Sequence, residues 1–137
     1  MNRLTLCLGL AMLLLLSACN SVSPAAAKEI QTERTKDIAI SLLSEKGELA
    51  MGKNRFIVAF RSTATNQPVD AGTVTVGSSM AMPGMTPMTA PIELEPAVAT
   101  GQYAAKGEFA MSGAWKFEVR WDGPAGKGSA TFSTNVR

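Results

Sequence analysis

The chain of 137 residues contains no histidine, only one tyrosine and only two cysteines. Without histidine it lacks the side chain that most often titrates near neutral pH and most often binds metals through nitrogen. No glycine-rich phosphate loop precedes a helix, and no acidic pair has the spacing of a catalytic motif. These absences predict that the protein is not an enzyme.

The chain also has no large excess of positive or of negative side chains. Lysine and arginine together number 13 and the acidic residues number 11, so the formal net charge is only +2. Proteins that bind nucleic acid usually concentrate positive charge on one face. The composition therefore predicts no nucleic-acid partner.

The one long apolar run, Leu4 to Leu16, is shorter than the roughly 20 residues that a membrane-spanning helix needs. Arg3 precedes it and small residues follow, which is the pattern of a secretory signal peptide. The stretch LSAC that ends at Cys19 resembles the lipobox of bacterial lipoproteins. That resemblance implies cleavage after residue 18 and attachment of lipid, including fatty acyl groups such as palmitate, to Cys19. The alternative is an ordinary signal peptide that happens to contain a cysteine.

Lipidation would leave the mature chain without a free thiol, which excludes a disulfide and a cysteine metal site. Several acyl chains would anchor the protein stably in the bacterial cell envelope. The residue after the cysteine is Asn20 and not an aspartate. This favours attachment to the outer membrane, facing the periplasm, over attachment to the cell membrane. Residues 19–35 are small, polar and proline-containing, so we expect a flexible tether, with a short helix over 28–36 as the alternative.

Residues 36–137 are expected to form one domain. In the segment 114–122, apolar Trp115, Phe117, Val119 and Trp121 alternate with charged residues, which is the period of a strand with one buried face. Shorter rows of the same kind begin near residues 38, 56, 74, 92, 101 and 129. About seven strands without a convincing helix predict an all-β, immunoglobulin-like sandwich. A small β-barrel is the alternative.

The order of four segments carries a family resemblance. GKNRFIVAF (52–60), a Met-Pro-Gly-Met cluster, GQY (101–103) and FAMSGAWKFEV (109–119) resemble the YtkA-like domain family over residues 36–137. This family is related to FixH-like proteins and to a segment of some heavy-metal efflux adaptors. The resemblance implies a β-sandwich module of the bacterial envelope, with metal-efflux or oxidase-assembly proteins as partners. Relatives often carry a histidine beside the methionine cluster, and this chain has none.

The methionine cluster lies in SSMAMPGMTPM, residues 78–88. Met80 and Met82 are two positions apart, so on an extended chain they point to the same side. Pro83-Gly84 favours a turn that would bring Met85 and Met88 back towards them. Uncharged, polarizable thioethers suit Cu(I) or Ag(I). They do not suit zinc, calcium or magnesium.

The family motif adds Met111 as a fifth candidate ligand, although core packing is the preferred interpretation for Met111 alone. Met51 needs no function. Methionine also fills cores and forms adaptable contact surfaces, so two functions stay open. The first is a lipid-anchored envelope protein that binds or delivers Cu(I) or Ag(I) through Met80, Met82, Met85 and Met88. The alternative is a structural or assembly module, without metal, that docks on an envelope protein complex.

Overall fold

The computed structural model describes residues 26–96 and 99–137, and the regular structure of these residues is entirely β-strand. The strands are β1 (Lys28–Arg34), β2 (Ile38–Ser44), β3 (Gly52–Ser62), β4 (Thr73–Met80), β5 (Met88–Pro96), β6 (Gln102–Phe109), β7 (Gly113–Gly123) and β8 (Gly126–Val136). None of the described segments is a helix long and apolar enough to cross a bilayer.

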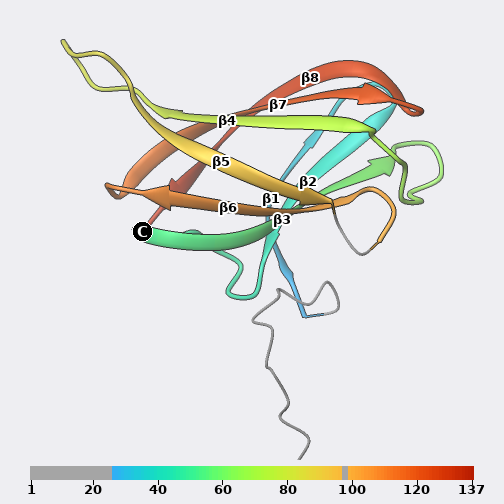
Figure 1. Ribbon diagram of the computed structural model, residues 1–137, viewed down its shortest axis with the longest axis horizontal. Coiled ribbons are helices and arrows are strands. Elements are labelled where there is room, and N and C mark those ends of the chain that lie inside the picture. The colour runs from blue at the N-terminus through green and yellow to red at the C-terminus, as the bar shows by residue number, and fades with distance from the viewer. Residues whose placement is uncertain (1–25, 97–98) are drawn as a thin grey trace, which may run out of the picture.

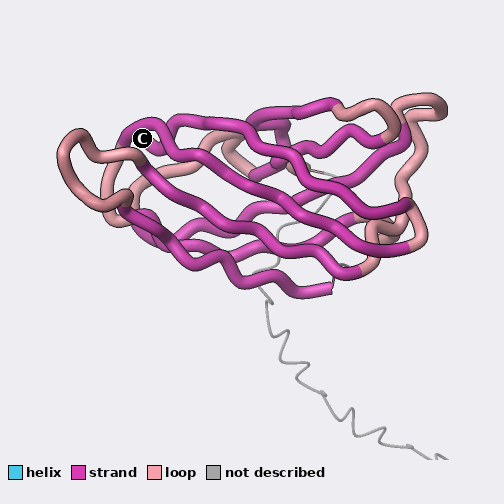
Figure 2. Tube along the Cα trace, turned by 90° about the horizontal axis from the view of Figure 1, so that it is seen from above, coloured by secondary structure: helices cyan, strands magenta, loops and turns pink. Residues whose placement is uncertain are grey.

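The strands follow the order β1-β2-β3-β6-β5-β4-β7-β8, and each neighbouring pair in that order is antiparallel. The sheet folds over so that β4, β7 and β8 face β2, β3 and β6, with the two edges β1 and β8 approaching each other (Figure 1). Seen from above, the strands wrap around a common interior (Figure 2). The predicted all-β, immunoglobulin-like sandwich is confirmed, with eight strands and a nearly barrel-like closure.

The additional strand is β1, so the expected tether over residues 19–35 is wrong for residues 28–34. Lys28–Arg34 pairs along β2, with a register shift between Glu29 and Gln31. Ile30 packs against the core, and the hydroxyls of Thr32 and Ser41 share a hydrogen bond of 2.6 Å. A polar, charged sequence is suited to an edge strand, because it discourages pairing with other chains. The signal peptide, Cys19 and the tether up to residue 25 lie outside the described residues.

The core is built around the inward face of β7. Trp115, Phe117 and Val119 are completely buried, as their alternation predicts. The Phe117 ring stacks on Phe132 with centroids 6.0 Å apart, and it meets Phe56 and Phe109 edge-on. Because these rings come from β3, β6, β7 and β8, one aromatic cluster joins the two faces of the sandwich.

Tyr103 on β6 joins the sheet to the loop before β4. Its hydroxyl donates a 2.9 Å hydrogen bond to the carbonyl oxygen of Gly72, and its ring meets Phe60 edge-on. Burial raises the pKa of the Tyr103 hydroxyl, and the negative charge of Asp70 raises it further. The folded protein therefore favours the neutral phenol.

The aromatic cluster predicts a sharp contrast between two adjacent residues. Phe117→Ala should lower the free energy of unfolding by about 3–5 kcal/mol, the range for a buried aromatic side chain. Lys116→Ala, on the exposed face of the same strand, should change it by less than about 0.5 kcal/mol. Denaturant titration of both variants measures the two values, and similar losses would contradict the assignment of faces in β7.

Tyr103 predicts a pH dependence of stability. Its raised folded pKa adds stability that is fully present below the ordinary tyrosine value of about 10 and is lost as the pH rises through the folded value. Since the chain has one tyrosine, ultraviolet absorbance of tyrosinate reports this titration directly. Tyr103→Phe should remove this part of the loss of stability at alkaline pH. It should also lower the free energy of unfolding by about 0.5–1.5 kcal/mol at neutral pH. An ordinary pKa in the folded protein would contradict the burial of the hydroxyl.

Candidate metal centre

The β4–β5 hairpin brings the first two candidate ligands together. Met80 ends β4, Met88 begins β5, and they are direct partners in the last pair of the ladder. Side chains of directly opposed residues share one face of the sheet, with Cβ atoms about 4.5–5.5 Å apart. Ser78 and Ala90, two positions back, are buried, so Met80 and Met88 share the inward face. Both are half-buried and pack against the core.

The next two methionines lie at the tip of this hairpin. The backbone N–H of Met85 donates a 3.1 Å hydrogen bond to the carbonyl oxygen of Met82. Gly84 has a φ of 72°, and with Pro83 before it the segment fits a type II turn. The predicted Pro83-Gly84 turn is confirmed. Met82 is half-buried, whereas Met85 is 68% exposed.

The β6–β7 turn lies beside the hairpin. A Cβ atom placed on Gly113 would be 3.1 Å from the sulfur of Met80, so this sulfur lies directly over the turn. The same turn contains Met111, whose carbonyl oxygen accepts a 3.0 Å hydrogen bond from the indole nitrogen of Trp115. The backbone of Met111 is thus fixed by a buried side chain. Its own side chain is 41% exposed, so the interpretation of Met111 as core packing is wrong.

Met51, to which the sequence assigned no function, lies at the same end of the sandwich. Gly52 pairs with Phe109, the last residue of β6, and the N–H of Met51 donates to the carbonyl oxygen of Arg137. The β4–β5 loop, the β6–β7 turn and the C-terminus lie together at the left of Figure 1. We call the hairpin tip, this turn and Met51 the methionine end. The methionine end forms only when distant strands pair, because Met51 and Met85 are far apart in the sequence.

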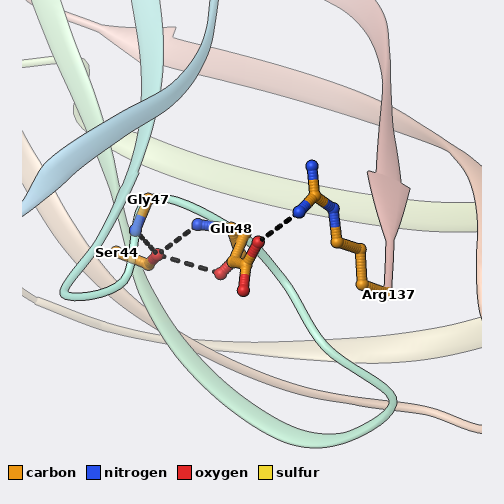
Figure 3. Close-up of polar contacts among 4 residues, drawn as sticks. All are labelled: Ser44, Gly47, Glu48 and Arg137. Carbon is orange, nitrogen blue, oxygen red and sulfur yellow. Dashed lines mark hydrogen bonds and ion pairs between the residues drawn. The ribbon is translucent and has the colours of Figure 1, made fainter.

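The loop before Met51 is fixed by a polar network (Figure 3). The Ser44 hydroxyl accepts hydrogen bonds from the N–H groups of Gly47 and Glu48 and donates one to the carbonyl oxygen of Glu48. The Glu48 carboxylate forms an ion pair of 3.1 Å with Arg137 at the C-terminus. The nearby carboxylate is therefore already engaged by a cation.

Other donor types do not gather into a metal site in the described chain. Residues 26–96 and 99–137 contain no group of three or more histidine, cysteine, aspartate or glutamate side chains that could hold an ion. Two surface hollows, of about 590 and 470 Å³, lie on the outer faces of the sheet and have no methionine in their lining. The donors at the methionine end are thus chiefly thioethers, which are soft ligands.

Comparisons with known proteins agree with the fold and define the family. Residues 32–120 match the YtkA-like family, and this segment includes the hairpin and the β6–β7 turn, so the chain belongs to the YtkA-like family. The chain is also similar to the crystal structure of a DUF4426 family protein from Pseudomonas aeruginosa PAO1. The two share 18% identity with a TM-score of 0.50, over 77% of this chain and 93% of the other. At that identity the likeness shows the fold alone. No curated protein is significantly similar to this chain.

Proposed function

We propose that this protein is a lipid-anchored binding module of the bacterial envelope that takes up Cu(I) or Ag(I) at the β4–β5 hairpin of its methionine end. The observation that carries the proposal is the arrangement of four methionines in one hairpin. Met80 and Met88 are paired on the inward face, and Met82 and Met85 close the tip. The Met80 sulfur lies over Gly113 in the β6–β7 turn, and the same turn contains Met111.

The chemistry of these donors favours a monovalent soft ion. Thioethers carry no charge, so they cannot compensate a divalent ion in a half-buried position. Cu(I) and Ag(I) carry a single charge and prefer polarizable sulfur. Methionine has three rotatable side-chain bonds, which gives the sulfurs of Met82 and Met85 freedom to turn towards an ion held by the Met80–Met88 pair. The site requires no cofactor other than the ion itself.

The location is part of the same proposal. Cleavage after residue 18 and lipid on Cys19 would hold the domain at a membrane. We assign this membrane as the outer membrane, with the domain facing the periplasm. Membership of the YtkA-like family supports an envelope setting. The partners we propose are envelope metal-efflux or oxidase-assembly proteins, which would receive or supply the ion.

The second candidate function is a docking module without metal. It is supported by the exposure of Met51, Met85 and Met111, which are the exposed large apolar side chains of the described chain. Exposed apolar groups gathered at one place often mark a contact surface. The two functions differ in whether the sulfur atoms or only the apolar bulk of these side chains matter.

The methionine hairpin gives the test that separates them. Met82→Leu combined with Met85→Leu keeps apolar bulk and removes two sulfurs, so the fold should survive and Ag(I) or Cu(I) affinity should fall at least about tenfold. Competition titration of the full chain in detergent, with Cys7→Ser and Cys19→Ser to remove thiols, measures this. Met51→Leu is the control, since it removes a sulfur outside the hairpin whose residue is about as exposed as Met85.

The parent should bind one Cu(I) with nearly the same affinity at neutral and mildly acidic pH, because thioethers have no proton to lose. It should not bind zinc. If the double variant binds as tightly as the parent, or the parent does not bind, the metal function is wrong and the docking module becomes the better explanation.

The anchor has its own test. Cys19→Ala removes the thiol that receives the lipid, so the variant should incorporate no labelled palmitate and should accumulate as the uncleaved precursor. Gel mobility and fatty-acid labelling in a bacterial host measure both effects. Normal cleavage after residue 18 together with normal acylation would contradict the lipobox assignment.

A further inference from the structure

The methionine end is also the part of the described chain most open to oxidants. Met51, Met85 and Met111 are 62%, 68% and 41% exposed. The described residues contain no cysteine, and the oxidisable rings of Trp115 and Trp121 are buried. Thioethers react with two-electron oxidants to give sulfoxides, in proportion to their access to solvent.

We propose that Met85 is a site of reversible sulfoxidation that switches soft-metal binding off, an inference that rests on the proposed function. In this reaction a hydroperoxide transfers one oxygen atom to the thioether sulfur. The O–O bond breaks, an S–O bond forms, the sulfur loses two electrons, and hydrogen peroxide leaves as water. A methionine sulfoxide reductase returns the thioether with two thiols as the electron donor: the S–O bond breaks, the thiols become a disulfide, and the oxygen leaves as water.

The two forms of the side chain differ in what they can bind. The thioether offers a polarizable sulfur lone pair, whereas the sulfoxide presents a polar oxygen that suits harder ions. Oxidation of Met85 therefore removes a ligand for Cu(I) or Ag(I). The fold tolerates the change, because the Met82–Met85 turn is closed by a backbone hydrogen bond and the Met85 side chain lies in solvent.

Burial separates Met85, which is exposed, from the other three hairpin methionines, Met80, Met82 and Met88, which are half-buried. Met80 and Met88 are half-buried and pack against the core, so we expect oxidants to reach their side chains less readily, and their oxidation would disturb the sandwich. Met85 is exposed and contributes nothing to that packing. The structure thus combines a protected pair, which maintains the hairpin, with one accessible sulfur that can be modified and restored.

A bound ion should protect the sulfur that it occupies, since the ion and the oxidant use the same lone pair. Met51 provides an internal control for this effect. Its exposed fraction is close to that of Met85, and it lies at the same end of the sandwich but outside the hairpin. Protection of Met85 without protection of Met51 would therefore report ligation, since general shielding of this end would affect both.

The test treats the full chain in detergent, carrying Cys7→Ser and Cys19→Ser, with hydrogen peroxide and follows each methionine by peptide mass spectrometry. Met85 and Met51 should oxidise at similar rates, several times faster than Met80 and Met88. With free Ag(I) at about ten times its dissociation constant, oxidation of Met85 should slow about tenfold, because about one tenth of the sites stay empty. Ag(I) is used because it does not cycle with peroxide. The rate of Met51 oxidation should be the same with and without Ag(I).

A second measurement tests the switch. Brief oxidation of a Met51→Leu variant, followed by Ag(I) titration, should show affinity at least about tenfold below that of the reduced protein, and treatment with a sulfoxide reductase should restore it. Equal affinity before and after oxidation overturns the switch and leaves the proposed metal function standing. Oxidation of Met80 or Met88 as fast as Met85 overturns the choice of site. Failure of the reduced protein to bind Ag(I) overturns both.

Discussion

The aromatic cluster around Phe117 is the interaction on which the rest of the structure depends. It joins β3, β6, β7 and β8 across the interior, and Trp115 extends it by meeting Phe109 at a centroid distance of 5.1 Å. The Trp115 indole in turn holds the carbonyl oxygen of Met111. Through this chain of contacts the rigid core determines where the β6–β7 turn lies. The turn then supplies the surface at Gly113 on which the Met80 sulfur lies.

The remaining surface contrasts with the methionine end. On this remaining surface the charged side chains form local ion pairs, among them Lys106 with Glu95, Arg120 with Glu118, and Lys127 with Asp122. Exposed ion pairs of this kind contribute little to stability, but they keep the outer faces polar. The exposed large apolar groups of the described chain are confined to the methionine end. This confinement makes one end of the sandwich chemically different from its sides.

The sequence predicted the parts of the fold whose signal is local. The alternation in residues 114–122 predicted the buried face of β7, and Pro83-Gly84 predicted the hairpin turn, because both patterns depend on neighbouring residues alone. β1 was missed because its residues are polar, and its strand conformation depends on pairing with β2. The place of Met51 depends on the pairing of Gly52 with Phe109 and could not be read from its surroundings in the sequence.

In the proposed lipid-anchored protein, the strand conformation of Lys28–Arg34 also limits the length of the segment between the domain and the membrane. If Cys19 carries the lipid, only residues 20–27 remain as a connection, and eight residues reach at most about 28 Å when fully extended. Lys28 lies against Gly47, in the loop that leads to Met51, so β1 begins at the same rim of strand ends that carries the methionines. An ion held there would travel with the lipid, and the search for a partner would take place in the two dimensions of the membrane surface.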